Sequence, residues 1–218
     1  MASTRGQRIG IWIIAIVMTV GTIGGFLVII LSSNNQKVEQ ARYTQLKNDF
    51  NTAYTAYQAQ AAAQQTQLSA DSFETLNQYA DRPAPFDKAS VTELKTEDLV
   101  VGDGEDITAD STFYAFYIGW NPDGKVFDSS IDGDKLKAPF EAKPGGVIQG
   151  WTEGVTGMKR GGIRELTIPA DKAYGSTGQG ADIPADTPLK FILYIPKYDT
   201  INTPVPSQEL LDLYTKYQ

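Results

Sequence analysis

The sequence predicts an α+β protein in which a short antiparallel sheet wraps on one short helix, preceded by a transmembrane helix and a helical stalk. Three observations predict this order. An uncharged apolar run extends from Gly10 to Leu31, a helix-periodic stretch without Gly or Pro follows from Gln36 to Leu68, and short alternating runs broken by turn residues begin at Val91. The predicted parts are an N-terminal tail over residues 1–9, a transmembrane helix over 10–31, a helical stalk and linker over 32–90, a sheet domain over 91–199, and a linker with a short helix over 200–218.

The amino-acid composition excludes several kinds of chemistry. The 218 residues include 19 Lys and Arg against 26 Asp and Glu, and the net charge of −7 argues against a nucleic-acid partner because phosphate binding requires a basic surface. The chain contains neither Cys nor His. Ser-His-Asp and Cys-His catalysis and the usual zinc ligand sets are therefore excluded, and we expect no metal or other cofactor. A Ser-Lys dyad or a pair of carboxylates stays open.

The run from Gly10 to Leu31 is long enough to cross about 30 Å of hydrocarbon at about 1.5 Å per residue. The alternative is a cleaved signal peptide, whose apolar region spans about 7 to 15 residues and ends at an Ala-x-Ala-like site. The segment from Leu31 to Asn35 contains no such site. We therefore expect a single-pass anchor in the cell membrane, with the lipid bilayer as the partner of residues 10–31.

Basic residues flank this run on both sides, with Arg5 and Arg8 before it and Lys37, Arg42 and Lys47 after it. The positive-inside rule is therefore nearly balanced. We favour the orientation that places the C-terminal part of the chain outside the cytoplasm.

The stalk contains an amphipathic helix. Its apolar stripe consists of Tyr43, Leu46, Phe50, Tyr54, Tyr57 and Ala61. Asp71 and Glu74 have the spacing of a capping box, which predicts a second short helix from about Ser72 to Ala80. The stripe shows no sustained heptad with complementary charges, so a helical hairpin and a homodimer through the stalk both remain open. Proline at 83 and 85 ends the helical region and places the domain boundary at about residue 90.

The region from residue 91 onward has the alternation of antiparallel strands. Residues 112–118 place Phe113, Ala115 and Tyr117 on one face of a strand. A turn at 121–124 leads into a short run at 125–127, and further strands are predicted over 163–168 and 189–195. The one helical stretch of this region runs over 149–158, so a sheet wrapped on a single short helix is the expected architecture.

Three segments of this region stand out: YIGWNPDGKVFDSS, VIQGWTEGVTGMKRGG and IPADKAYGSTGQGADIPADTPLKFILYI. In content and order they resemble the successive motifs of FKBP-type peptidyl-prolyl cis/trans isomerases, over roughly residues 98 to 198. The resemblance implies an FKBP-like fold that isomerises X-Pro bonds in folding proteins without covalent chemistry. Its partners would be proline-containing unfolded or partly folded polypeptides.

The resemblance also implies a pocket for the substrate proline. Trp151 would form its floor, and the walls would be Tyr117, Phe127, Phe140, Val147, Ile148 and Phe191. The backbone N–H of Ile148 and the hydroxyl of Tyr174 would donate to the carbonyls that flank the proline. Asp128 would accept a hydrogen bond from the Tyr117 hydroxyl, and Ile183 would lie on the flap above the pocket.

Two residues of the flap depart from the family pattern. Gln179 stands where many members have His, and Asp182 stands where they have an aliphatic residue. Because burying an unpaired carboxylate is costly, we expect Asp182 at the exposed rim. We expect altered substrate preference and weaker binding of macrolides such as tacrolimus and rapamycin, with catalysis retained.

A second hypothesis is a membrane-tethered holdase or scaffold that has an FKBP-like fold and little isomerase activity, and that grips unfolded chains with the Tyr-rich helix.

The C-terminal tail is predicted to contain a short helix. Ser207 is a predicted N-cap for a helix over 208–217. The apolar face of this helix would pack either on the sheet domain or on the stripe of the stalk, and both possibilities remain open.

Overall fold

The computed structural model describes residues 33–216, so the transmembrane helix expected over 10–31 lies outside the described residues. Between residues 33 and 216, every helix is too short or too polar to cross a membrane. The described residues divide into two compact units, one made of residues 33–61 together with 201–216, and one made of residues 62–200. Each unit is described by itself below.

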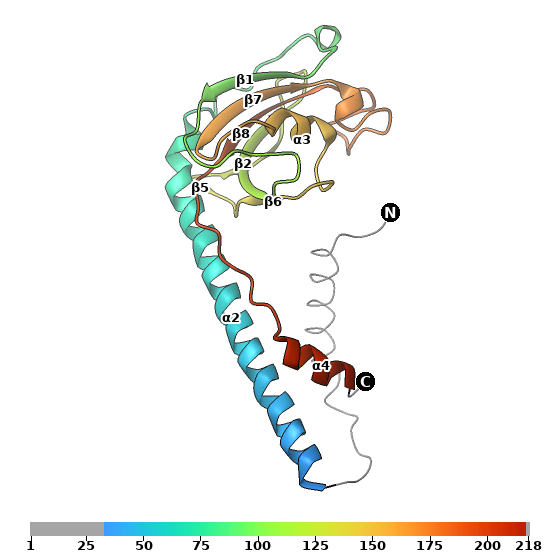
Figure 1. The fold of residues 1–218 in the computed structure, drawn as a ribbon. Helices are drawn as coiled ribbons and strands as arrows, with labels where there is room; N and C mark the ends of the chain where they lie inside the picture. Colours follow the sequence, from blue (N-terminus) through green and yellow to red (C-terminus); the bar gives the residue numbers. More distant parts are fainter. Residues whose placement is uncertain (1–32, 217–218) are drawn as a thin grey trace. The chain divides into compact units, whose positions relative to one another are not determined.

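The larger unit is built on a six-stranded antiparallel sheet with the strand order β1-β7-β8-β2-β3, in which β6 also pairs with β2 (Figure 1). The sheet strands are β1 (Lys95–Val100), β2 (Phe113–Trp120), β3 (Val126–Ser129), β6 (Phe140–Ala142), β7 (Gly162–Ile168) and β8 (Leu189–Ile195). A separate two-stranded sheet pairs β4 (Ile131–Asp132) with β5 (Lys135–Leu136). The predicted strand over 189–195 is confirmed at both ends, and the predicted turn closes with a hydrogen bond of 2.9 Å from Gly124 N–H to the Asn121 carbonyl.

One face of the sheet packs against the short helix α3 (Gln149–Val155), as Figure 1 shows. The prediction placed the end of this helix at Met158, but the helix ends earlier because Thr156 has a ψ of 129°, outside the helical range, and Gly157 has a φ of 81°. The close approach of α3 to the sheet requires glycine at position 150, because a Cβ there would lie 2.3 Å from the Ile168 side chain. The strand β2 alternates as predicted: Phe113 and Ala115 are buried in the core on this face.

The opposite face of the sheet is also covered, in contrast to the predicted architecture of a sheet on a single helix. The helix α2 (Ser33–Asn77) contributes Leu68 and Leu76 to a core that includes Phe116, Ile118 and Trp120 of β2. Leu76 and Phe116 are both fully buried. The last turns of the predicted stalk are therefore part of the sheet unit.

An ion pair joins the linker after α2 to the face of the sheet that α2 covers. Glu165 of β7 is buried, with its side chain 9% exposed. It accepts a hydrogen bond of 2.6 Å from Arg82 in the linker and one of 3.0 Å from Lys190 of β8. Burial alone would raise the pKa of Glu165, but the hydrogen bonds from Arg82 and Lys190 outweigh burial and hold this pKa below its usual value.

The second short helix predicted over 72–80 does not form separately, because α2 continues unbroken to Asn77. Asp71 lies inside α2, and its side chain accepts a hydrogen bond from Gln67 one turn earlier instead of capping a new helix. Ser72 is 2% exposed against the sheet, so packing holds this segment in the helix.

The smaller unit pairs the first part of α2 with the C-terminal helix α4 (Gln208–Lys216). Leu210 packs with Phe50 of the predicted stripe, and Tyr43, Leu46 and Tyr54 lie against them. Glu209 accepts two hydrogen bonds from the Arg42 guanidinium, at 2.9 and 3.0 Å. The tail helix therefore packs on the stripe of the stalk, which was one of the two places left open for it.

Short 3-10 turns complete the larger unit: η1 (Lys88–Ser90) lies in the linker before β1, and η2 (Ala170–Lys172) follows β7. The turn η2 leads into the segment that carries Tyr174 and Ile183.

Candidate active site

A cavity of about 460 Å³ opens on the α3 side of the larger unit. Nine of the ten residues implied by the family resemblance line it together with two glycines that were not predicted. The lining residues are Tyr117, Phe127, Asp128, Phe140, Gly145, Gly146, Val147, Ile148, Trp151, Tyr174 and Phe191.

Aromatic rings form the inner surface of this cavity. Trp151, on α3, is 5% exposed, and three rings meet it edge to face. The centroid distances from the Trp151 ring are 5.3 Å to Tyr117, 5.3 Å to Phe191 and 5.8 Å to Phe140. Edge-to-face rings at such distances hold one another in fixed orientations. The cavity is therefore a shaped apolar surface that suits a compact apolar ring.

The width of the cavity depends on Gly119 of β2. A Cβ at this position would lie 2.6 Å from the ring of Phe191 and 2.8 Å from the ring of Phe127. Distances this short force one of the partners to move, and both partners are walls of the cavity. The two rings therefore occupy the space that a side chain at position 119 would take.

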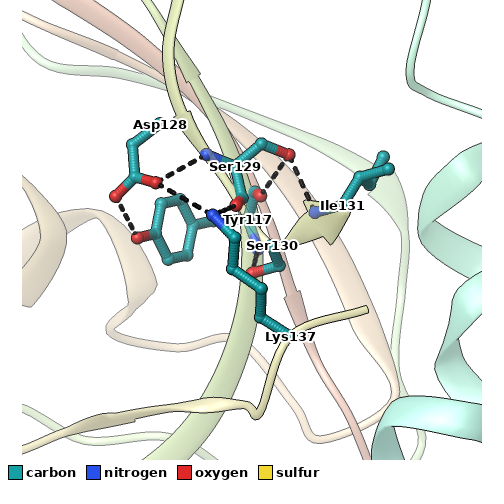
Figure 2. Close-up of polar contacts among 6 residues, drawn as sticks. All are labelled: Tyr117, Asp128, Ser129, Ser130, Ile131 and Lys137. Carbon is teal, nitrogen blue, oxygen red and sulfur yellow. Dashed lines mark hydrogen bonds and ion pairs between the residues drawn. The ribbon is translucent and has the colours of Figure 1, made fainter. Parts of the chain in front are cut away.

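Two residues that line the cavity, Tyr117 and Asp128, belong to a polar cluster that Figure 2 shows. The Tyr117 hydroxyl donates a hydrogen bond of 2.5 Å to the carboxylate of Asp128, whose other oxygen accepts a hydrogen bond of 2.8 Å from the Ser129 N–H. Lys137 lies 3.7 Å from that same oxygen and donates a hydrogen bond of 2.7 Å to the Ser129 carbonyl. The carboxylate is thus held by a hydroxyl, an amide and a cation.

Both tyrosines of the cavity are poor acids. Burial, reinforced by the hydrogen bond to Asp128 and its negative charge, raises the pKa of Tyr117 far above its usual value. Burial also raises the pKa of Tyr174, and the charge of Asp128 adds to this effect. The two hydroxyls therefore remain hydrogen-bond donors over the whole physiological pH range.

The two hydrogen-bond donors that the family resemblance implies at the cavity both lack a partner within the described part of the chain. The backbone N–H of Ile148 makes no hydrogen bond there, in keeping with its position as the N-cap of α3, where the first N–H groups of a helix lack partners inside the helix. The hydroxyl of Tyr174 makes none within residues 33–216 either. The cavity therefore offers two donors to a bound molecule.

Ile183 is the predicted site residue that does not line the cavity. It is 4% exposed and belongs to the core on the α3 side of the sheet. The two departures from the family pattern lie in the same loop: Gln179 is exposed, and Asp182, with its side chain 43% exposed, forms an ion pair with Lys125.

Sequence reasoning missed Gly145, Gly146 and Lys137. The glycine pair after Pro144 was a signal for a tight turn, and Gly145 has a φ of 74°. Nothing in the sequence pointed to Lys137, because it reaches the Asp128 carboxylate only through the turn between β4 and β5.

Comparison with known proteins agrees with this geometry. The sequence profile of the family described as FKBP-type peptidyl-prolyl cis-trans isomerase matches residues 104–195. The FK506-binding protein of Neisseria meningitidis is 41% identical over 98 residues, which are 45% of this chain and 89% of that protein. FK506-binding protein 4 of Dictyostelium discoideum is 46% identical over 100 residues, again 45% of this chain but only 26% of that longer protein.

The antiparallel sheet on α3 and the aromatic cavity beside it define an FKBP-type domain. The chain belongs to the family of FKBP-type peptidyl-prolyl cis-trans isomerases. This confirms the family, the fold and the class of enzyme that the sequence motifs implied.

Proposed function

We propose that the cavity binds X-Pro segments of unfolded or partly folded polypeptides and accelerates rotation of the X-Pro bond without covalent chemistry. The observation that carries this proposal is the pairing of an aromatic cavity with two unpartnered donors, the Ile148 N–H and the Tyr174 hydroxyl. The proline ring fits the aromatic cavity, and the carbonyl groups on either side of the proline can accept hydrogen bonds from the two donors.

The proposed roles follow the positions of the residues. Trp151 supports the proline ring from the floor of the cavity, with Phe127 and Phe191 at its walls. Ile148 and Tyr174 donate hydrogen bonds to the flanking carbonyls and so hold the backbone while the peptide bond rotates.

The physical reason that such a cavity is sufficient lies in the reaction itself. Rotation about the peptide bond must overcome about 18–20 kcal/mol because amide resonance is lost, although cis and trans X-Pro differ by only about 0.5–1 kcal/mol. In the twisted transition state the charge separation of the amide falls, so an apolar cavity suits it better than water does. No nucleophile or general base is required, in agreement with a chain that has neither His nor Cys.

The test is a protease-free isomerisation assay of an X-Pro peptide with the full chain. Phe127→Ala and Asp128→Ala each remove a cavity residue, and we expect kcat/KM to fall at least tenfold while the circular dichroism spectrum stays unchanged. Val126→Ala is the matched control, since Val126 precedes Phe127 on β3 but does not line the cavity. Unchanged activity in both cavity variants would falsify the proposal.

We also propose that residues 10–31 anchor the enzyme in the cell membrane as a single span, with the isomerase domain outside the cytoplasm. The length and apolarity of this run support the anchor. Two measurements test it: fractionation of cells into membrane and soluble parts, and digestion of the domain by protease added to intact cells. A protein recovered entirely in the soluble fraction would contradict the anchor, and a protected domain would contradict the orientation.

The holdase alternative finds less support in the smaller unit. It requires the Tyr-rich face of the stalk to be free for unfolded chains, but α4 packs on that face through Leu210. Suppression of aggregation by the full chain, at concentrations that do not accelerate isomerisation, would favour the alternative.

The apolar stripe of the stalk is also the candidate surface for a homodimer. Sedimentation of the full chain in detergent, measured over a range of concentrations, distinguishes a monomer from a dimer.

The names of the two relatives describe proteins that bind FK506. We propose that this chain binds FK506 more weakly, because Asp182 places a carboxylate in the loop beside the cavity. Titration calorimetry of FK506 with this chain and with the Neisseria meningitidis relative compares the two affinities, and binding by this chain that is equally tight or tighter would contradict the proposal.

A further inference from the structure

The loop that carries Tyr174 is organised by its own backbone. We call residues 174–186 the active-site loop. Within it, hydrogen bonds run from Gly178 N–H to the Tyr174 carbonyl at 3.1 Å, from Gln179 N–H to the Ile183 carbonyl at 2.7 Å, and from Asp186 N–H to the Gly175 carbonyl at 2.8 Å. The loop is therefore one connected body, with Tyr174 at its start and Asp182 near its exposed end.

Asp182 bonds this loop to the turn between β2 and β3. Lys125 of that turn donates a hydrogen bond of 2.5 Å to the carboxylate of Asp182. Asn121 of the same turn donates a hydrogen bond of 3.1 Å from its amide nitrogen to the Asp182 backbone carbonyl. One residue of the loop thus meets two residues of the turn, through its side chain and through its backbone.

Asn121 is suited to hold a fixed position. It is 6% exposed, and its side-chain oxygen accepts hydrogen bonds of 3.1 Å from the N–H groups of both Asp123 and Lys125. Because the oxygen is engaged in this way, the amide nitrogen must point toward Asp182. The turn is held from its other side as well, by a hydrogen bond of 2.9 Å from Phe86 N–H to the Pro122 carbonyl.

The turn and the loop continue into different walls of the cavity. The turn leads directly into Phe127 and Asp128, whereas the loop begins with Tyr174. The bonds between turn and loop therefore join the two segments that carry these walls.

We propose that Asn121, Lys125 and Asp182 form a latch that holds the active-site loop in its binding position and so places the Tyr174 hydroxyl for the substrate. This rests on the proposed function of the cavity. Asn121 and Lys125 are positioning residues, since neither lines the cavity. The ion pair is exposed on both sides, at 60% for Lys125 and 43% for Asp182, so salt screens it and the loop opens for part of the time.

The latch affects binding more than the rate of rotation. When only a fraction of the molecules has the loop in place, the apparent affinity for substrate falls by that fraction. Once the substrate is bound the loop is in place in every variant, so the bond rotates as in the wild type.

The experiment uses the full chain and a protease-free isomerisation assay. We expect Lys125→Met and Asp182→Asn each to raise KM three- to tenfold with kcat within twofold of the wild type. We expect the reversed pair, Lys125→Asp with Asp182→Lys, to restore KM to within threefold. Added salt raises the KM of the wild type and leaves that of Lys125→Met unchanged.

Lys95→Met is the matched control, because Lys95 is 61% exposed and forms an ion pair with Glu93 away from the cavity. Its KM should equal that of the wild type. The proposal is overturned if both single variants keep the wild-type KM, if kcat falls instead, or if the reversed pair fails to restore KM.

Hydrogen exchange provides a readout that does not depend on activity. The amide protons of Gln179 and Asp186 are bonded inside the loop, and opening of the latch exposes them. We expect their exchange to be at least threefold faster in Lys125→Met and unchanged in Lys95→Met. If the wild type proved inactive, the proposed function would fail while this measurement still decided the latch, and equal exchange in all three proteins would overturn it.

Discussion

The hydroxyl of Tyr117 and the carboxylate of Asp128 are joined by a hydrogen bond of 2.5 Å at the edge of an aromatic cavity. Tyr117 also meets Trp151 edge to face, so the same side chain links the carboxylate to the floor of the cavity. The bond therefore connects the polar rim of the site to its apolar floor.

Tyr117→Phe and Asp128→Asn each remove this bond and should lower kcat/KM by about five- to thirtyfold, since a hydrogen bond to a charged group is worth about 1–2 kcal/mol here. In the double variant the loss should be no larger than in the worse single variant, because both changes remove one interaction. Peptide exchange measured by NMR gives the rates. If the activation free energies lost in the two single variants add up in the double variant, the two residues act independently.

The pH dependence of activity should be flat between about pH 6 and pH 9. The chain has no His, and burial raises the pKa of both Tyr117 and Tyr174 above the usual value of about 10, so neither hydroxyl loses its proton in this range. A rate assay at constant ionic strength tests this expectation. A loss of activity with a midpoint below pH 9 would contradict the proposed role of neutral donors.

Glu165 should stabilise the fold in a pH-dependent way. Its folded pKa is depressed, so its contribution is complete above the unfolded pKa of about 4.3 and is lost as the pH falls through the lower folded value. We expect Glu165→Gln to lower the free energy of unfolding by about 1–3 kcal/mol at pH 7, and this difference from the wild type should shrink toward pH 3. Urea unfolding measures both.

Glu97→Gln is the control for this prediction. Glu97 also faces Arg82, at 3.5 Å, but its side chain is 67% exposed, so its loss should cost less than about 0.5 kcal/mol. A difference between wild type and Glu165→Gln that stays constant from pH 7 to pH 3 would argue against the ionic contribution.

The sheet domain needs the last turns of α2 in order to fold, because they cover one face of the sheet. A fragment of residues 91–200 lacks Leu68 and Leu76 and leaves Phe116 and Trp120 without cover, so it should aggregate or bind hydrophobic dyes, whereas a fragment of residues 62–200 should fold. Chromatography and near-ultraviolet circular dichroism compare the two. A monomeric, cooperatively unfolding 91–200 fragment would refute this.

A point variant tests the same core in the full chain. Leu76→Ala should cost about 2–5 kcal/mol, because Leu76 is fully buried, whereas the exposed Gln78→Ala should stay within about 0.5 kcal/mol. Both values come from urea unfolding.

The sequence anticipated the parts of the fold whose pattern is local. The strand β2 alternates between two faces, and the strand β8 has the predicted bounds, because their side chains enter a core on both sides. The cavity residues were found through the family motifs, since aromatic residues in strands have the same local pattern in a core and in a site.

The parts that were missed depend on contacts between distant segments. The strand β1 is an exposed edge strand, so Lys95 and its polar neighbours show no apolar alternation. The capping-box pattern at Asp71 was overridden because Ser72 and Leu76 are buried against the sheet and keep α2 continuous. The tie between Lys125 and Asp182 joins two turns far apart in the chain, which no pattern along the sequence reveals.

Gly119 gives the cavity a property of a different kind. The rings of Phe127 and Phe191 fill the space behind the cavity where a side chain would stand. The size of the site can therefore be changed through a residue that does not itself line the cavity. Selection for a smaller or differently shaped substrate ring has a route through this one position that leaves every donor and every lining residue in the sequence as it is.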